Sequence, residues 1–224
     1  YDGEILTVDA EVGRLLDALA ASEVAESTLV VLTSDHGESL GEHDYFFEHG
    51  ANLYDPGMKV PLIVAGPGFT PGTRSRELAT TLDLVPTLLD AVKVSYPPGL
   101  SGRSLLPAVR GRTLGRERLP GQNDRNHVGL WDERFKIVGT PTGKGRRLAL
   151  YDRETDPGET EDAGGRLPDR MTEERQRLAG LLEEMDAESA RTRRLLEGRS
   201  GEERLSAEAC EQLKAMGYIQ DGCP

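Results

Sequence analysis

The chain has 224 residues, with 39 acidic and 27 basic side chains and a formal net charge of -12. This acidic balance argues against nonspecific nucleic-acid binding, which needs a basic surface to meet the phosphates. Two cysteines, Cys210 and Cys223, are too few for a disulfide scaffold and lack metal-binding spacing. No apolar run approaches the roughly 18 residues that a membrane span needs. Because the chain begins with Tyr1 and not Met, we expect it to be processed, trimmed or fragmentary.

The first part of the chain alternates helical and strand patterns. Residues 3–24 place apolar side chains at helical spacing, which predicts an amphipathic helix with one face on a core. The apolar run Thr28–Thr33 predicts a strand covered on both faces, and residues 58–68 predict a second strand. A second amphipathic helix is expected at 78–94, with Asp83 near its start, where a carboxylate complements the helix dipole. The alternation indicates an α/β fold with a mainly parallel sheet.

The later part of the chain has a different pattern. Two strands are expected at 127–140 and 146–152, separated by the turn-forming residues 141–145. Such a hairpin indicates a small antiparallel sheet. A long charged helix at 172–197 and a short helix from Ser206 to Gly217 are predicted to follow.

These patterns divide the chain into three predicted parts. Residues 1–115 form a portion of an α/β domain, 116–165 a small antiparallel subdomain, and 166–224 a helical C-terminal tail.

The segment Thr33–Gly50 contains three of the four histidines, among five acidic residues. In open α/β sheets, ligands bind beyond the carboxyl ends of strands. Asp35 and His36 lie just past such an end, and a carboxylate oxygen with an imidazole nitrogen makes half of a site for a divalent metal. The alternative is that Asp35 caps the turn and His36 is a solvated loop residue.

Several segments together resemble one family. They are "TLVVLTSDHGESLGEH", "HGANLYDPGMKVPLIVAGPG", "LDLVPTLLDAV", "GLSGRSLLP", "LYDRETDPGETEDA" and "LKAMGYI". In this order and spacing the chain resembles the C-terminal half of a sulfatase, of the alkaline phosphatase superfamily. The resemblance implies part of an alkaline-phosphatase-like, mainly parallel sheet with flanking helices, plus a small C-terminal antiparallel sheet and a helical tail.

The resemblance also implies roles for individual residues. Asp35 and His36 match the pair that binds the catalytic metal from this half of the domain. His49 matches a position where the family has Lys or His contacting the substrate's anionic group or its leaving oxygen, so it is a catalytic and substrate-binding candidate; a packing histidine is the alternative. His43 has no role to transfer, and we expect it to organise the loop through a hydrogen bond.

The resemblance implies no role for three further charged residues near the histidine-rich segment. Lys59, which precedes the second strand, is a substrate-binding candidate if it faces the pocket, with an exposed strand-end lysine as the alternative. Glu38 and Glu42 are expected to be solvated or to support the metal ligands from outside.

One divalent metal ion is the expected cofactor. The resemblance implies Ca²⁺, but His36 stands where the family frequently has Asn, and an imidazole ligand favours Mn²⁺ or Zn²⁺ more than an all-oxygen site would. Sulfatases carry a formylglycine nucleophile in a C/S-x-P-x-R motif and two further metal-binding aspartates, and this chain has neither. Both are expected on a missing N-terminal half, so we expect the chain alone to be inactive.

We therefore predict that the chain is a fragment of a metal-dependent sulfuric ester hydrolase. Its partners would be an anionic sulfate-ester or phosphate-ester substrate and the missing half of the domain, with no nucleic acid. One alternative is a phosphate or phosphonate ester hydrolase, or a phosphoglycerol-type transferase, of the same superfamily. Another is a noncatalytic fragment or degenerate relative. The resemblance implies a periplasmic or extracellular location, with a cytoplasmic one left open.

Overall fold

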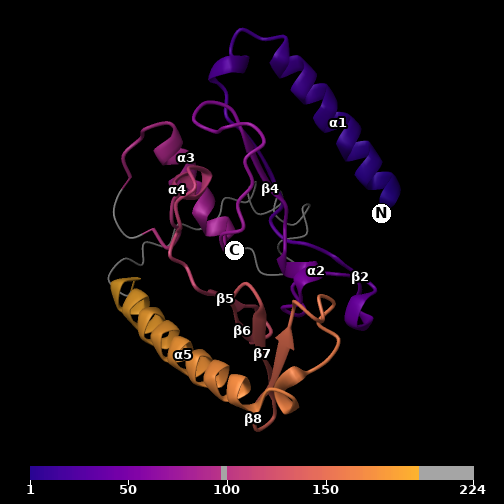
Figure 1. Ribbon diagram of the computed structural model, residues 1–224, viewed down its shortest axis with the longest axis vertical. Helices are drawn as coiled ribbons and strands as arrows, with labels where there is room; N and C mark the ends of the chain where they lie inside the picture. Colours follow the sequence, from indigo (N-terminus) through magenta and orange to yellow (C-terminus); the bar gives the residue numbers. More distant parts are fainter. Residues whose placement is uncertain (97–99, 197–224) are drawn as a thin grey trace, which may run out of the picture. The chain divides into compact units, whose positions relative to one another are not determined.

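The computed structural model describes residues 1–96 and 100–196 (Figure 1). The predicted short helix from Ser206 to Gly217 and both cysteines lie outside the described residues. The chain divides into two compact units, Tyr1–Leu178 and Ala179–Pro224, and the boundary falls within the last described helix. The predicted division into three parts stays a prediction.

Five α-helices and eight strands make up the described residues. The helices are α1 (Asp2–Ala20), α2 (Asp55–Met58), α3 (Leu84–Ala91), α4 (Leu106–Val109) and α5 (Pro168–Leu196). The strands are β1 (Val30–Thr33), β2 (Ser39–Leu40), β3 (Phe46–Glu48), β4 (Leu62–Ala65), β5 (Leu119–Gln122), β6 (Val128–Trp131), β7 (Phe135–Thr142) and β8 (Gly145–Asp152). Short 3₁₀ turns lie at Ala25–Ser27, Glu42–Asp44, Thr81–Asp83 and Ala163–Gly165. None of these described helices is both long enough and apolar enough to cross a bilayer.

The two predicted strands of the first part form, but they pair differently from the expectation. β1 and β4 pair antiparallel, with Val31 opposite Val64. A parallel pair needs a crossover connection, usually a helix of some length, and the only helix between these strands is the four-residue α2. The strands are also less covered than predicted, since Ile63 is 60% exposed. The exposure arises because this sheet has only two strands within the described residues.

The first predicted helix is confirmed as α1, but its predicted packing is wrong for the described chain. No residue of α1 is buried, and its apolar side chains include Ile5 at 53% and Leu15 at 70% exposure. No described element covers this face.

The second predicted helix is confirmed as a 3₁₀ turn leading into α3. Thr80 and Asp83 form a reciprocal capping box at its start. The Asp83 carboxylate is fully buried and bound by both terminal nitrogens of Arg116, at 2.5 and 2.8 Å. Asp83 therefore has the structural role predicted for it, strengthened by an ion pair that the sequence did not indicate.

The later part forms a four-stranded antiparallel sheet in the order β5-β6-β7-β8. The antiparallel sheet was predicted, but the expected single strand at 127–140 is two strands, β6 and β7. The Asp132 carboxylate accepts hydrogen bonds from the backbone N–H groups of Arg134 and Phe135, at 2.8 and 2.7 Å. An aspartate that bonds to backbone two residues ahead reverses the chain, and this turn separates the strands.

The best-packed core lies against this sheet. Leu53, Val138 and Tyr151 form a buried cluster on which Tyr54 and Ala149 pack. The segment around Leu53 therefore belongs to the core of the antiparallel sheet, although it is close in sequence to the histidine-rich segment.

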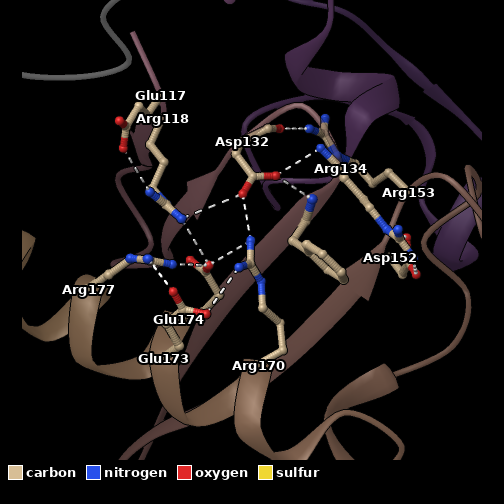
Figure 2. A network of polar contacts seen from close by, with 11 residues as sticks. Glu117, Arg118, Asp132, Arg134, Asp152, Arg153, Arg170, Glu173, Glu174 and Arg177 are labelled. Carbon is tan, nitrogen blue, oxygen red and sulfur yellow. Dashed lines mark hydrogen bonds and ion pairs between the residues drawn. The ribbon is translucent and has the colours of Figure 1, made fainter.

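A network of ion pairs joins the start of α5 to the sheet (Figure 2). The Glu174 carboxylate, almost fully buried, contacts Arg118, Arg170 and Arg177 at 3.2, 3.1 and 2.8 Å. Asp132, in the β6–β7 turn, contacts Arg170 at 2.8 Å and Arg118 at 3.6 Å. The network holds residues 168–178 of the helix on the sheet within the first compact unit.

Candidate active site

The loop that follows β1 brings Asp35 and His36 together at the protein surface. The His36 Nε2 atom lies 3.7 Å from the Asp35 Oδ2 atom. The Asp35 side chain is 80% exposed and the His36 side chain 44%. Two neighbouring side chains that leave a strand usually diverge, and here the turn makes them converge.

Hydrogen bonds fix the chemical state of both groups. The His36 Nδ1 atom lies 2.8 Å from the carbonyl oxygen of Gly37. A carbonyl only accepts, so Nδ1 carries a proton, and in the neutral imidazole Nε2 then presents a lone pair. The backbone N–H of His36 donates to Asp35 Oδ1 at 3.0 Å. This bond holds the pKa of Asp35 below its usual range, so the carboxylate is ionised at neutral pH.

This pair fits a divalent metal ion. Oxygen ligands lie about 2.3–2.6 Å from Ca²⁺, so two ligand atoms at a right angle are roughly 3.3–3.7 Å apart. The 3.7 Å between Nε2 and Oδ2 matches that separation. Metal-binding histidines commonly donate their other ring N–H to a carbonyl, as His36 does to Gly37. Residues 1–96 and 100–196 contain no group of three or more side chains that could hold a metal ion, so the candidate site on the described residues is this pair of side chains.

His49, the catalytic candidate, lies beside this pair. Its ring stacks on the His36 ring, with centroids 4.0 Å apart and an interplanar angle of 19°. Its Nδ1 atom lies 3.3 Å from Glu38 Oε2, a contact in which the carboxylate accepts. Glu38 was expected to be solvated or to support the metal ligands from outside, and it contacts the catalytic candidate His49 directly. Glu42 instead accepts the backbone N–H of Leu40 at 2.7 Å.

His43, the third histidine, organises the loop by a different contact from the one expected. Its ring stacks on Tyr54 with centroids 3.5 Å apart, and its φ is 56°. Because a β-carbon is strained at positive φ, the stack stabilises a backbone turn that has an intrinsic cost. The predicted hydrogen bond is absent from the contacts of the His43 side chain, since its Nε2 is buried without a partner in the described chain.

Lys59, the substrate-binding candidate, lies at the end of α2 and lines a cavity of about 360 Å³ together with Asp35 and His36. The lining also includes Trp131 from β6 and Arg153 from beyond β8. His49 is not among the residues that line this cavity.

The sequence analysis missed the charged residues behind the cavity. Asp55, which lines it, contacts Lys136 at 2.6 Å and Arg153 at 3.4 Å. Burial acts to raise the pKa of Asp55, and the charge and hydrogen bond of Lys136 outweigh it, so the pKa is lowered. The available signal was an acid in "LYDPG" and a lysine in an otherwise apolar strand.

Gly37 permits the close approach of α2 to the loop. A β-carbon built at Gly37 would lie 1.9 Å from the carbonyl oxygen of Pro56. We therefore expect Gly37→Ala to push the two segments apart and to lower the free energy of unfolding by about 1–3 kcal/mol, as overpacking does. Urea unfolding measures it, with Gly13→Ala on the exposed surface of α1 as the control, where a β-carbon meets no neighbour. Equal stability of Gly37→Ala and the parent chain would contradict this close approach.

Comparison with known proteins shows similarity to one family. Residues 1–94 match the family model described as Sulfatase. This part of the chain is similar to the sulfatase family. It is 28% identical over 189 residues to arylsulfatase K of Xenopus laevis, a match that covers 78% of this chain and 35% of that protein. The chain therefore spans about a third of the length of this curated relative.

Solved structures give a similarity of the same kind. BT4656, solved with its substrate D-glucosamine-2-N,6-O-disulfate, superimposes with a TM-score of 0.70 at 28% identity, covering 82% of this chain and 39% of that one. The phosphonate monoester hydrolase of Silicibacter pomeroyi superimposes with a TM-score of 0.65 at 28% identity, covering 82% of this chain and 39% of that one. The fold-class prediction, alkaline-phosphatase-like with a small antiparallel sheet, is confirmed.

Proposed function

We propose that this chain is part of a metal-dependent sulfuric ester hydrolase and supplies Asp35 and His36 as two of its metal ligands. The observation that carries the proposal is the pair itself: an ionised carboxylate and an imidazole lone pair 3.7 Å apart, beyond the end of β1. The match of residues 1–94 to the sulfatase family model supports the reaction class.

A divalent ion bound to this pair would polarise the sulfate oxygens and withdraw negative charge from the reacting centre. The chain's own residues would orient the ion and bind the substrate. Asp35 and His36 would orient that ion, and Lys59 would add positive charge on the cavity side. His49, held by Glu38 through Nδ1, would present Nε2 towards the ester. The family's formylglycine nucleophile and the remaining ligands would come from residues outside these 224.

The metal is proposed to be Ca²⁺, on family grounds. The donor set on this chain, one carboxylate and one imidazole, also suits Mn²⁺ or Zn²⁺. A chain variant with His36→Asn would restore an all-oxygen pair and separate these choices by its metal preference.

The exposed apolar surface supports a further domain portion as partner. The apolar faces of α1 and of the β1–β4 pair are uncovered, and Ile5, Leu15 and Ile63 are each more than half exposed. An exposed apolar surface that extends over several residues marks an interaction site more often than single exposed residues do. We propose that the rest of a sulfatase catalytic domain covers them. A periplasmic or extracellular location stays a prediction.

Phosphonate or phosphate ester hydrolysis is the second candidate function. The phosphonate monoester hydrolase similarity favours it, because a tetrahedral anion of either kind meets the same metal and cations. The sulfatase family match ranks sulfate esters first. The transferase and noncatalytic alternatives stay predictions.

Turnover of matched esters tests the proposal. The complete protein containing these residues would be offered an aryl sulfate, an aryl phosphate and a phosphonate monoester with one common leaving group, before and after metal chelation. Sulfate turnover that chelation abolishes is the expected result. Faster phosphonate turnover would favour the second candidate, and no turnover of any ester would contradict both.

Replacing His49 with alanine should slow turnover by about 10²–10⁴-fold, the range for loss of a general acid or base, while the metal stays bound. Turnover and metal stoichiometry measured on the same sample check this. His43→Ala is a matched control, because it removes a histidine that stacks on Tyr54 and not on His36. An equal loss of metal and activity in His49→Ala would make His49 a ligand.

A further inference from the structure

Lys136 is a fully buried lysine on β7, in the middle of the antiparallel sheet. Its ammonium nitrogen lies 2.6 Å from Asp55 Oδ1, 2.6 Å from Glu159 Oε1 and 3.0 Å from the carbonyl oxygen of Leu53. The ammonium group donates hydrogen bonds to Asp55 and to the Leu53 carbonyl, and its contact with Glu159 is an ion pair without a hydrogen bond. The ammonium nitrogen also lies 5.4 Å from the ring centroid of Trp131. Removing such a charge from water costs several kcal/mol per ion, so this arrangement holds only with all its partners in place.

The contacts of Lys136 and Glu159 converge on one stretch of chain at the start of α2. Leu53 and Asp55 are two residues apart, and Glu159 uses its second oxygen to accept the backbone N–H of Asp55 at 2.7 Å. Two side chains from the region of the antiparallel sheet, Lys136 and Glu159, therefore hold the start of α2 from both its side-chain and its backbone atoms.

The held stretch in turn supports the metal-binding loop. The carbonyl oxygen of Gly57 accepts the backbone N–H of Gly37 at 2.9 Å. The next link is the Gly37 carbonyl, which accepts from His36 Nδ1 at 2.8 Å. Gly37 also lies too close to Pro56 for any side chain. Continuous hydrogen bonds and close contacts thus run from Lys136 through α2 to the imidazole of His36.

We propose that Lys136, Asp55 and Glu159 form a positioning unit that sets the orientation and tautomer of His36, so that the antiparallel sheet holds the metal-binding loop in its productive geometry. The inference rests on the proposed function, in which His36 is a metal ligand. Lys136 does not touch the substrate; it acts through α2. Such support matters because a displacement of about 1 Å at a reacting site can cost roughly 10² in rate.

The histidine side chains give a direct readout. The chain has four histidines, so the imidazole ¹⁵N signals of the full chain are few, and His36→Gln assigns the His36 signal. At a pH of about 8.5, above the usual histidine pKa of about 6.5, the signal reports which ring nitrogen carries the proton. The parent chain should have the proton of His36 on Nδ1.

Lys136→Met should redistribute that proton between Nδ1 and Nε2. It should also speed hydrogen exchange of the Gly37 amide by about tenfold, as expected for a weakened hydrogen bond. If Lys136→Met does not fold, Glu159→Gln retains the volume, removes the charge of the ion pair and should change both signals in the same direction by less. Asp55→Asn keeps an oxygen for Lys136 and should stay closer to the parent chain than Asp55→Ala.

Glu174→Gln is the matched control, since it neutralises another buried carboxylate with several cationic partners. It should leave His36 and Gly37 unchanged. Unchanged signals in folded Lys136→Met or Glu159→Gln would overturn the inference, as would equal changes in Glu174→Gln.

Mn²⁺ separates this inference from the proposed function. Paramagnetic broadening of the His36 signal in the complete protein, which holds the remaining ligands, is expected if His36 is a ligand. Absence of broadening, with the Lys136 effect intact, would remove the metal role and leave the positioning role. Broadening without a Lys136 effect would do the reverse.

Discussion

Asp35→Ala in the complete enzyme is expected to abolish metal binding and to lower turnover by about 10³-fold or more, because the metal is assigned several kcal/mol of charge stabilisation. Asp35 contributes the carboxylate of the pair, and its Oδ2 atom lies 3.7 Å from His36 Nε2. Without it, a single imidazole remains from this loop. Metal stoichiometry by elemental analysis and turnover of an aryl sulfate, measured together, check the prediction.

Asp35→Asn and Asp44→Asn make a matched pair for this test. Both replace an exposed aspartate in the histidine-rich segment, and asparagine tolerates the positive φ of 63° at Asp44. Asp35→Asn should weaken metal binding, since a neutral amide replaces the charge, and Asp44→Asn should not. Near-normal turnover in Asp35→Ala would remove Asp35 from the site.

Arg116→Met is expected to lower the free energy of unfolding by roughly 3–5 kcal/mol at neutral pH, the cost of leaving a buried charge without its partner. Asp83 has no exposed surface, and the guanidinium group binds both its oxygens. The backbone N–H groups of Thr80 and Arg103 remain as donors, at 2.9 and 2.7 Å. These two donors favour the lower end of that range. Urea unfolding measures the change.

The pH dependence gives this prediction a sign. Burial acts to raise the pKa of Asp83, but the hydrogen bonds from Arg116 and from the backbone outweigh it and lower the pKa. The ionised carboxylate therefore stabilises the fold above its unfolded pKa of about 3.9, and this contribution is lost as the pH falls through the folded pKa. In Arg116→Met burial is less opposed, so the difference between parent and variant should shrink as the pH falls towards about 4.

Arg112→Met is the control, because Arg112 is exposed and four residues away. Its effect should stay within about 0.5 kcal/mol, as for most surface substitutions. A loss as small as this in Arg116→Met would show that the Asp83 carboxylate is solvated in solution.

The sequence predicted the candidate site better than its supports. Asp35 and His36 are adjacent in the chain, so their proximity needed no tertiary information. Lys136 lies 81 residues from Asp55, and nothing local in either segment indicates the other. A charged residue in an apolar strand was the only signal, and a strand-surface lysine explains it equally well. Contacts of this range depend on how the segments fold together, which periodicity does not report.

Strand predictions failed where a turn was concealed in a strand-like pattern. Residues 127–140 look like one long strand because apolar side chains stand on both sides of Asp132. The side chain of Asp132 competes with strand pairing by bonding to the backbone ahead of it. For α1 the periodicity gave the helix correctly. It could not say whether another element would lie on the apolar face.

The ion-pair network at the start of α5 has a consequence for sequence variation. Glu174 is contacted by Arg118, Arg170 and Arg177, so losing one arginine leaves the carboxylate compensated by the other two. Losing Glu174 instead removes the carboxylate that all three share and leaves Arg118 and Arg170 on Asp132 and Arg177 on Glu173. Among natural variants of this chain, each arginine can therefore drift on its own, whereas a change at Glu174 weakens the contacts of all three arginines at once.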